Sequence, residues 1–271
     1  GGGQPASMQN IKGVRELCDK YGIKLFFDAA RFSENAFFIK QREKGYEKKS
    51  IQEIVKEMFS FVDGCTMSAK KAAIVNMGGF LAFREKELFD KCVPFAILFE
   101  GYPTYGGMSG REMEAIAVGL REGIEEDYLR ARIAQVRYLG ESLAKAGIPI
   151  MKPVGGHAVF IDGKKFLHQI PQEQFPSFSL SAELYLEAGI RGVEIGTVMA
   201  GRDPKTGENV IPKLDLMRLT IPRRVYLKEH MDYIIEAMKK IKERKDSIKG
   251  LKFSFESPVL RHFWSRFEPV K

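Results

Sequence analysis

Helix-like and strand-like segments alternate at the start of the chain, and this order constrains the fold more than any other feature. Apolar residues recur at helical spacing over residues 11–18, and Gly22 follows where such a helix would end. Residues 23–27 form an almost wholly apolar run, typical of a buried parallel strand, which ends at Asp28. The same order repeats in a second helix and strand, at residues 51–61 and 65–66. This alternation predicts an α/β fold.

The second half of the chain has a different pattern. Residues 110–146 predict one long helix, of the kind that leads from one domain into the next. Two short strand candidates and one amphipathic helix follow, at residues 157–161, 217–221 and 231–241. Strands and helices mixed in this way suggest a smaller α+β domain. We therefore predict a first domain over residues 1–120 and a second over residues 121–271.

The net charge of +8, from 43 basic and 35 acidic residues, could indicate an anionic partner. Much of the excess alternates with apolar residues near the C-terminus, as expected for the solvated face of a helix. The basic residues of this stretch are Lys239, Lys240, Lys242, Arg244, Lys245, Lys249 and Lys252. No nucleic-acid-binding motif accompanies them, so we expect no nucleic-acid partner.

Three cysteines are too few for a disulfide framework and do not have the spacing of a zinc or redox motif. The sequence has no secretory signal pattern and no apolar run near the ~20 residues that a membrane helix needs. We therefore expect a cytoplasmic protein without a membrane partner. The chain opens Gly1-Gly2-Gly3 without an initiator Met, as if it were cut from something longer.

Asp28 and Arg31 are the first candidate site residues. Ligands of open α/β sheets bind beyond the carboxyl ends of the strands, where Asp28 is predicted to lie. Arg31 follows closely enough to share a ligand with it. The alternative is that Asp28 caps the next helix.

Lys71 is the second candidate, because hydroxyl groups precede it in Thr66-Met67-Ser68-Ala69-Lys70-Lys71. Hydroxyls, backbone N–H groups and lysines suit phosphate binding. The alternative is a solvated lysine pair on a loop. Together with Asp28, however, Lys71 fits pyridoxal phosphate: its aldehyde forms a Schiff base with a lysine amine, and its ring nitrogen needs a carboxylate partner.

Three further residues are weaker candidates. Arg218 lies within a predicted strand, where a substrate carboxylate would explain it and an edge position facing water is the alternative. His262, beside Phe263 and Trp264, is either a packed group or a substrate contact. His157 follows two glycines at the start of a strand, and we interpret it as structural.

Taken together, these residues and their surroundings resemble the tryptophanase and tyrosine phenol-lyase family of β-eliminating lyases. The resemblance extends almost from end to end, and it is carried by residues 2–5, 27–31, 63–71, 75–80, 105–107, 135–140, 153–157 and 218–224. It implies a PLP-dependent transferase-like fold (fold type I): part of a large domain with a mainly parallel sheet, and a smaller C-terminal α+β domain.

The resemblance also implies roles for individual residues. Lys71 matches the lysine that carries the cofactor and removes the α-proton, and Asp28 matches the partner of the pyridine nitrogen. The remaining cofactor contacts are predicted at Arg31 (near the phenolic oxygen), Ser68 and Lys70 (phosphate). Arg218 matches the arginine that binds the substrate carboxylate. Asn76 matches a position whose carbonyl helps to bind a monovalent cation, K⁺.

Within the family, two positions favour tryptophanase. Phenol-lyases carry an arginine where this chain has Ile195 and a phenylalanine where it has His262, and residues 201–207 also look like tryptophanase. An apolar Ile195 suits indole, and His262 could reach the indole N–H. The resemblance therefore predicts β-elimination of L-tryptophan to indole, pyruvate and ammonia, with conversion of L-tyrosine to phenol as the alternative.

The chain matches only the C-terminal part of these enzymes, so part of the cofactor site would come from an N-terminal segment or a second polypeptide. The resemblance also implies a homotetramer. Two other hypotheses remain: a basic nucleic-acid-binding or scaffold fragment, and a non-catalytic remnant that folds without holding the cofactor.

Overall fold

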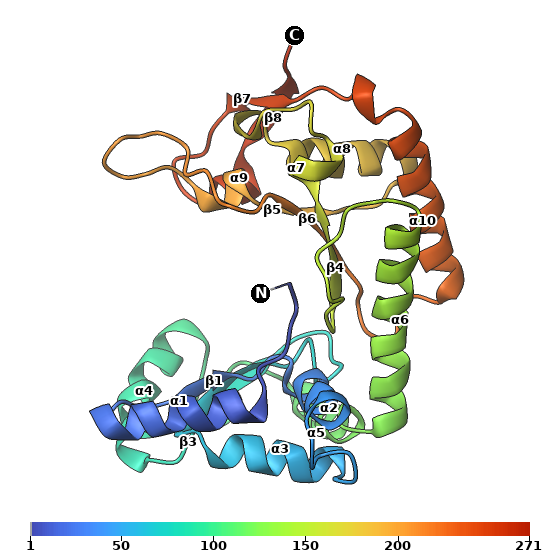
Figure 1. Cartoon of the computed structure of the whole chain (residues 1–271). Helices are drawn as coiled ribbons and strands as arrows, with labels where there is room; N and C mark the ends of the chain where they lie inside the picture. The colour runs from blue at the N-terminus through green and yellow to red at the C-terminus, as the bar shows by residue number, and fades with distance from the viewer. Residues whose placement is uncertain (1) are drawn as a thin grey trace. The chain divides into compact units, whose positions relative to one another are not determined.

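A computed structural model of the chain describes residues 2–271 and separates them into two compact units (Figure 1). The N-terminal unit is Pro5–Ile133, and the C-terminal unit is Ala134–Lys271 together with residues 2–4. The division falls inside helix α6 (Glu126–Lys145), whereas the sequence places it after residue 120.

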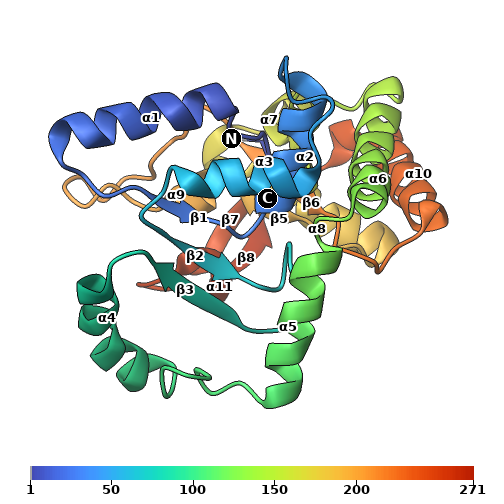
Figure 2. The same cartoon turned by 90° about the horizontal axis from the view of Figure 1, so that it is seen from below.

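The N-terminal unit is built on a three-stranded sheet with the order β1-β2-β3 (Figure 2). β1 and β2 are parallel, and β2 and β3 are antiparallel. The elements are α1 (Met8–Tyr21), β1 (Phe26–Asp28), α2 (Phe32–Arg42), α3 (Ile51–Ser60), β2 (Gly64–Ser68), β3 (Gly79–Phe83), α4 (Lys86–Phe99), α5 (Gly110–Glu122) and the first part of α6.

Local sequence signals explain where α3 and α5 begin. Each helix follows a serine that forms a capping box with the glutamate three residues later, in the pairs Ser50–Glu53 and Ser109–Glu112. These pairs satisfy backbone N–H groups that have no partner inside the helix. The helix predicted over residues 51–61 is confirmed by α3.

The first strand is shorter and more exposed than predicted. The prediction of a parallel strand is confirmed, since β1 pairs in parallel with β2, but β1 covers only Phe26–Asp28, and Ile23 is 57% exposed outside it. Among the described residues, β1 pairs only with β2 and therefore lies at the edge of the sheet. The expectation of a buried strand over residues 23–27 is wrong for this unit, because an edge strand is covered less than a central one.

The single helix predicted over residues 110–146 is also wrong, because α5 ends at Glu122 and α6 begins at Glu126. Gly123 is the C-cap residue of α5 and lies directly against the backbone of Ala72, in the loop after β2. A Cβ atom on this glycine would stand 2.1 Å from the carbonyl oxygen of Ala72. Only glycine allows such a close backbone approach, and glycine weakens a helix by about 1 kcal/mol relative to alanine.

The C-terminal unit contains a three-stranded antiparallel sheet with the order β4-β6-β5 and a separate two-stranded sheet of β7 and β8. Its elements after α6 are β4 (Ala158–Asp162), α7 (Gly163–Phe166), η1 (Gln172–Gln174), α8 (Pro176–Ala188), β5 (Val193–Ile195), α9 (Thr197–Ala200), β6 (Leu216–Thr220), α10 (Lys228–Glu243), η2 (Lys245–Ser247), β7 (Leu251–Phe255), α11 (Arg261–Trp264) and β8 (Arg266–Pro269).

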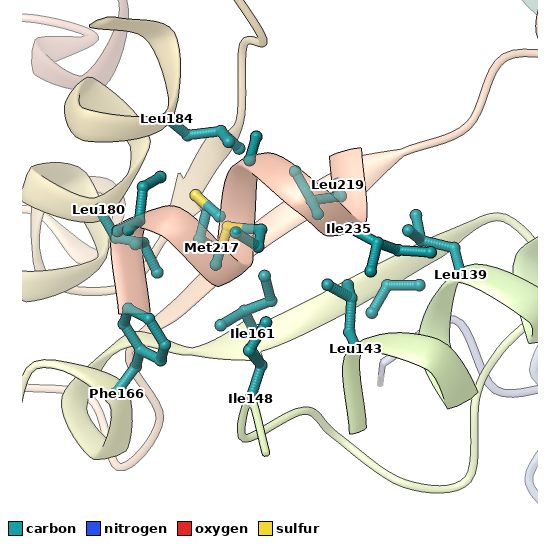
Figure 3. Packing of buried hydrophobic residues seen from close by; sticks show 14 of the residues in the cluster. Leu139, Leu143, Ile148, Ile161, Phe166, Leu180, Leu184, Met217, Leu219 and Ile235 are labelled. Carbon is teal, nitrogen blue, oxygen red and sulfur yellow. The ribbon is translucent and has the colours of Figure 1, made fainter. Parts of the chain in front are cut away.

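The core of this unit lies on one face of the β4-β6-β5 sheet, where Met217 and Leu219 pack with residues of α6 and α10 (Figure 3). Met231, Met238 and Ile241 of α10 are fully buried, whereas the lysines on the same helix are exposed. The prediction that the basic C-terminal stretch includes the wet face of an amphipathic helix is therefore confirmed. Across residues 2–271, the structure contains no helix with the length and apolarity to cross a membrane.

Candidate functional site

Asp28 and Ser68 lie at the same edge of the N-terminal sheet. β1 and β2 run in parallel, and their register pairs Asp28 with Thr66, two residues before Ser68 at the end of β2. Side chains alternate between the two faces of a strand, so Asp28, Thr66 and Ser68 share one face. Cys65 and Met67 point to the other face and pack into a buried cluster. The sheet thus presents a carboxylate and two hydroxyls together.

Lys71 belongs to the same group. Its ammonium Nζ donates a hydrogen bond of 2.7 Å to Ser68 Oγ, and the lysine side chain is half-buried. Because Ser68 lies on the face that carries Asp28, this contact holds the amine of Lys71 near that face. The alternative, in which Lys70 and Lys71 are both freely solvated, therefore does not fit Lys71. It fits Lys70, which is exposed.

The backbone around Lys71 is tightly fixed. The N–H of Ala72 donates to the carbonyl of Ala30 at 3.1 Å, which joins the loop after β2 to the loop after β1. Ala69, Ala72 and Ala73 are almost completely buried. The residues that flank Lys71 therefore pack into the unit, whereas Lys71 itself is only half-buried.

Asp28 does not cap the next helix. Its Oδ1 accepts a hydrogen bond of 3.1 Å from the N–H of Ala30, within the loop, and the N-cap position of α2 is Arg31. Asp28 is exposed in this unit, whereas Arg31 is half-buried. Asn76 lies in an exposed bend between β2 and β3, near the same edge of the sheet.

Arg218 lies in β6, the central strand of the C-terminal sheet, directly opposite Phe160 of β4 and Val193 of β5. The alternative of an edge-strand arginine facing water is therefore wrong. Its Nε is buried and has no hydrogen-bond partner among residues 2–271. Because an unsatisfied buried N–H costs free energy, an anion that accepts from it would give this arginine a function.

Ile195 lies on the same face of this sheet as Arg218. It pairs with Leu216, two residues before Arg218, and packs beside a small cluster of Ala158, Phe160 and Leu216. His262 lies in α11, half-buried, with its ring centroid 4.0 Å from that of Phe263. The sheet thus brings together Arg218 and Ile195, which are far apart in the sequence.

His157 is buried at the start of β4, and its ring centroid is 5.9 Å from that of Phe160 in an edge-to-face contact. A Cβ atom on Gly3 would be 3.0 Å from the imidazole, so the chain start packs closely on this ring. These contacts agree with the interpretation of His157 as a structural residue.

Two residues of this unit were not singled out from the sequence. Arg261, directly before His262, is 7% exposed, and Glu194, directly before Ile195, is 5% exposed. Burial raises the pKa of Glu194 to about 7; N–H donors from Val198, Met199 and Gly196 act against this shift, and nearby Asp215 adds to it. In the sequence, the only signal for these two residues is a charged side chain directly before each residue proposed to select the substrate, Ile195 and His262. That the charged side chains are buried is visible only in the fold.

Solved structures with the same architecture define the class of fold. The serine palmitoyltransferase of Sphingomonas wittichii aligns with a TM-score of 0.53 at 13% identity, over 89% of this chain and 51% of that chain. A second structure, described as SPT with PLP, aligns with a TM-score of 0.57 at 14% identity, over 88% and 52%. At such low identity these similarities concern the fold alone, and they confirm the predicted fold type I of PLP-dependent transferases.

The sequence itself defines the family. Residues 1–237 match the beta-eliminating lyases, and the chain belongs to this family. The tyrosine phenol-lyase of Symbiobacterium thermophilum is 54% identical over 269 residues, which is 99% of this chain and 59% of the relative. That of Fusobacterium nucleatum is 55% identical over 266 residues, which is 98% and 58%. The chain thus spans less than two thirds of the length of these curated relatives.

The names of these relatives bear on the predicted substrate. The membership of a β-eliminating lyase family is confirmed. The similar proteins, however, are called tyrosine phenol-lyases, which agrees with the alternative better than with the prediction of tryptophanase.

Proposed function

We propose that the whole protein is a pyridoxal-phosphate-dependent lyase that removes the aromatic ring of an L-amino acid by β-elimination and releases pyruvate and ammonia. The observation that carries this proposal is the common sheet edge of Lys71 and Asp28. A carboxylate at the end of β1 and an amine shortly after the end of the adjacent parallel strand β2 are the two groups that this cofactor needs at its ring nitrogen and at its aldehyde.

The residues of the N-terminal unit fit pyridoxal phosphate. Lys71 would bind it covalently through Nζ, and Asp28 would accept a hydrogen bond from its ring nitrogen. Ser68 and the exposed Lys70 offer a hydroxyl and a positive charge for its phosphate, and Arg31 would lie near its phenolic oxygen. When bound, the cofactor supplies an electron sink for the charge that develops at the substrate Cα.

Proton transfer is the task of Lys71 in this proposal. Its Nζ is held at 2.7 Å by Ser68 Oγ, which orients the amine. At an operating pH of about 7, a lysine side chain acts as a base only when its pKa lies well below its usual ~10.4.

Arg218 would bind the substrate carboxylate. Its position in a central strand and its unsatisfied buried Nε suit a planar two-pronged donor for an anion. Holding the carboxylate fixes the orientation of the Cα–H bond and so favours its cleavage.

L-tyrosine is the substrate favoured by the relatives, because proteins that are 53–55% identical to this chain are named tyrosine phenol-lyase. The products would then be phenol, pyruvate and ammonia. L-tryptophan is the second candidate, favoured by the side chains at positions 195 and 262. Ile195 is apolar and lies on the face of Arg218, and half-buried His262 offers a nitrogen to an indole N–H.

The direct test uses the purified full-length protein with added pyridoxal phosphate and each amino acid in turn. Pyruvate formation measures β-elimination, and separation of phenol from indole identifies the substrate. Absence of pyruvate from both amino acids would contradict the proposed activity. Measurements in K⁺ and in a bulky organic cation would test whether the Asn76 segment binds a cation, and sedimentation would test the tetramer.

A further inference from the structure

Helix α9 (Thr197–Ala200) has only four residues and begins two positions after Ile195. A single helical turn is not stable by itself, because it has too few internal hydrogen bonds. The N–H groups of its second and third residues are bound by Glu194, whose two carboxyl oxygens accept from Val198 at 3.0 Å and Met199 at 3.1 Å. One end of α9 is therefore attached to the strand that carries Ile195.

Arg261 binds backbone carbonyl groups of α9 and of the residue that follows it. Its Nε donates to the carbonyl of Val198 at 2.8 Å, and its Nη2 donates to the carbonyls of Thr197 and Gly201 at 2.6 and 2.8 Å. Three backbone carbonyls around one short helix thus share a single guanidinium. Only the forked geometry of arginine can reach all three at once.

The remaining donor group of Arg261 is also bound. Its Nη1 donates to Asn209 Oδ1 and to Glu256 Oε1, both at 2.8 Å. Every N–H of the guanidinium therefore has an acceptor, and the side chain is 7% exposed. A buried group with all its donors engaged has one orientation, so the backbone at residue 261 is fixed relative to α9.

The chain just before Arg261 supports this conclusion. Leu260 has a φ of 50°, a left-handed conformation that residues other than glycine rarely adopt. Such a conformation persists where the surrounding contacts determine it. Leu260 directly precedes the fixed side chain of Arg261, and His262 is the residue that follows it.

We propose that Arg261 is a positioning residue that fixes His262 of α11 relative to Ile195 of β5, through α9, and thereby sets which aromatic ring the enzyme accepts. This inference rests on the proposed β-elimination of aromatic amino acids. It assigns no contact with substrate to Arg261 itself.

The variant Arg261→Lys distinguishes positioning from simple charge. Lysine keeps the positive charge beside Glu256, but its N–H donors all leave one nitrogen, so it cannot reproduce the forked set of contacts that the guanidinium makes with the three carbonyls, Asn209 and Glu256. In the full-length protein we expect the ratio of kcat/KM for L-tyrosine to kcat/KM for L-tryptophan to change by about 10-fold or more, as loss of an oriented polar contact does. The matched control is Arg266→Lys, since Arg266 is exposed in the neighbouring β8.

Hydrogen–deuterium exchange supplies a readout that does not depend on activity. Amides of residues 197–201 and 261–264 should exchange faster in Arg261→Lys than in the wild type, and those of α10 should not. A substrate ratio within twofold of the wild type would overturn the inference, whether or not exchange changes. If the wild type releases pyruvate from neither amino acid, the proposed function fails and the inference fails with it.

Discussion

Gly119 of α5 lies against the carbonyl oxygen of Ala73, so that a Cβ atom on this glycine would stand 1.7 Å from that oxygen. Ala73 is only two residues after Lys71. The backbone contact between α5 and this loop is therefore part of what holds the loop that carries the lysine.

Replacement of Gly119 by alanine should destabilise the protein. The new methyl group must push away either α5 or the loop, and such overpacking costs about 1–3 kcal/mol, more than the ~1 kcal/mol that alanine contributes in a helix. Urea unfolding measures the change. The matched control is Gly13→Ala in α1, where a Cβ atom meets nothing within 4 Å. Equal stability of the two variants would contradict this account of the loop.

Lys71→Ala should abolish covalent attachment of pyridoxal phosphate. Borohydride reduction followed by peptide mapping of the wild type should place the label on residue 71, because its half-buried amine is held beside Ser68. The comparison is Lys70→Ala, which should still be labelled, since Lys70 is exposed and has only a proposed phosphate contact. A label on residue 70 in the wild type would refute the assignment.

Arg218→Met should weaken substrate binding without unfolding the protein. A charge-assisted hydrogen bond contributes about 1.5–3 kcal/mol, so we expect KM to rise by about 10- to 100-fold. Stability should be unchanged or higher, because the buried Nε of Arg218 has no hydrogen-bond partner among the described residues. A loss of stability with an unchanged KM would instead assign Arg218 a structural role.

Ile195→Arg combined with His262→Phe should shift preference from L-tryptophan towards L-tyrosine. The arginine places a cation on the sheet face that Ile195 shares with Arg218, where it can bind a phenol oxygen, and the phenylalanine removes a hydrogen-bonding ring. Release of indole and phenol by the double variant measures the shift. Unchanged ratios for the double variant would show that neither position determines the substrate.

Glu194 should make stability depend on pH. Burial raises its pKa from 4.5 to about 7, so between these values the folded protein binds more protons than the unfolded chain. The free energy of unfolding therefore falls as pH rises through this window, by on the order of 3 kcal/mol from this group. Glu194→Gln should reduce the fall, whereas Glu141→Gln, at an exposed position of α6, should leave it intact. Parallel pH profiles for wild type and Glu194→Gln would disprove the role of Glu194.

Much of the local structure follows from local sequence. The capping serines Ser50 and Ser109 and the apolar spacing of α10 predict their helices because the groups involved lie within one or two turns. Lys71 and Asp28 could be singled out because the residue types fit one chemistry. Their shared sheet face could not be derived in this way, since it depends on the parallel register of β1 and β2.

The sequence by itself determined the alternation of helices and strands, the family and the residue types of the candidate site. Only the tertiary structure decided that Arg218 lies in a central strand, that Gly119 and Gly123 admit the backbone of another segment, and that Arg261 binds two carbonyls of α9 and that of Gly201 directly after it. The physical reason is the separation along the chain of the residues that interact. Helix caps and periodicity act between near neighbours, whereas burial and hydrogen-bond satisfaction depend on segments that meet only when the chain has folded.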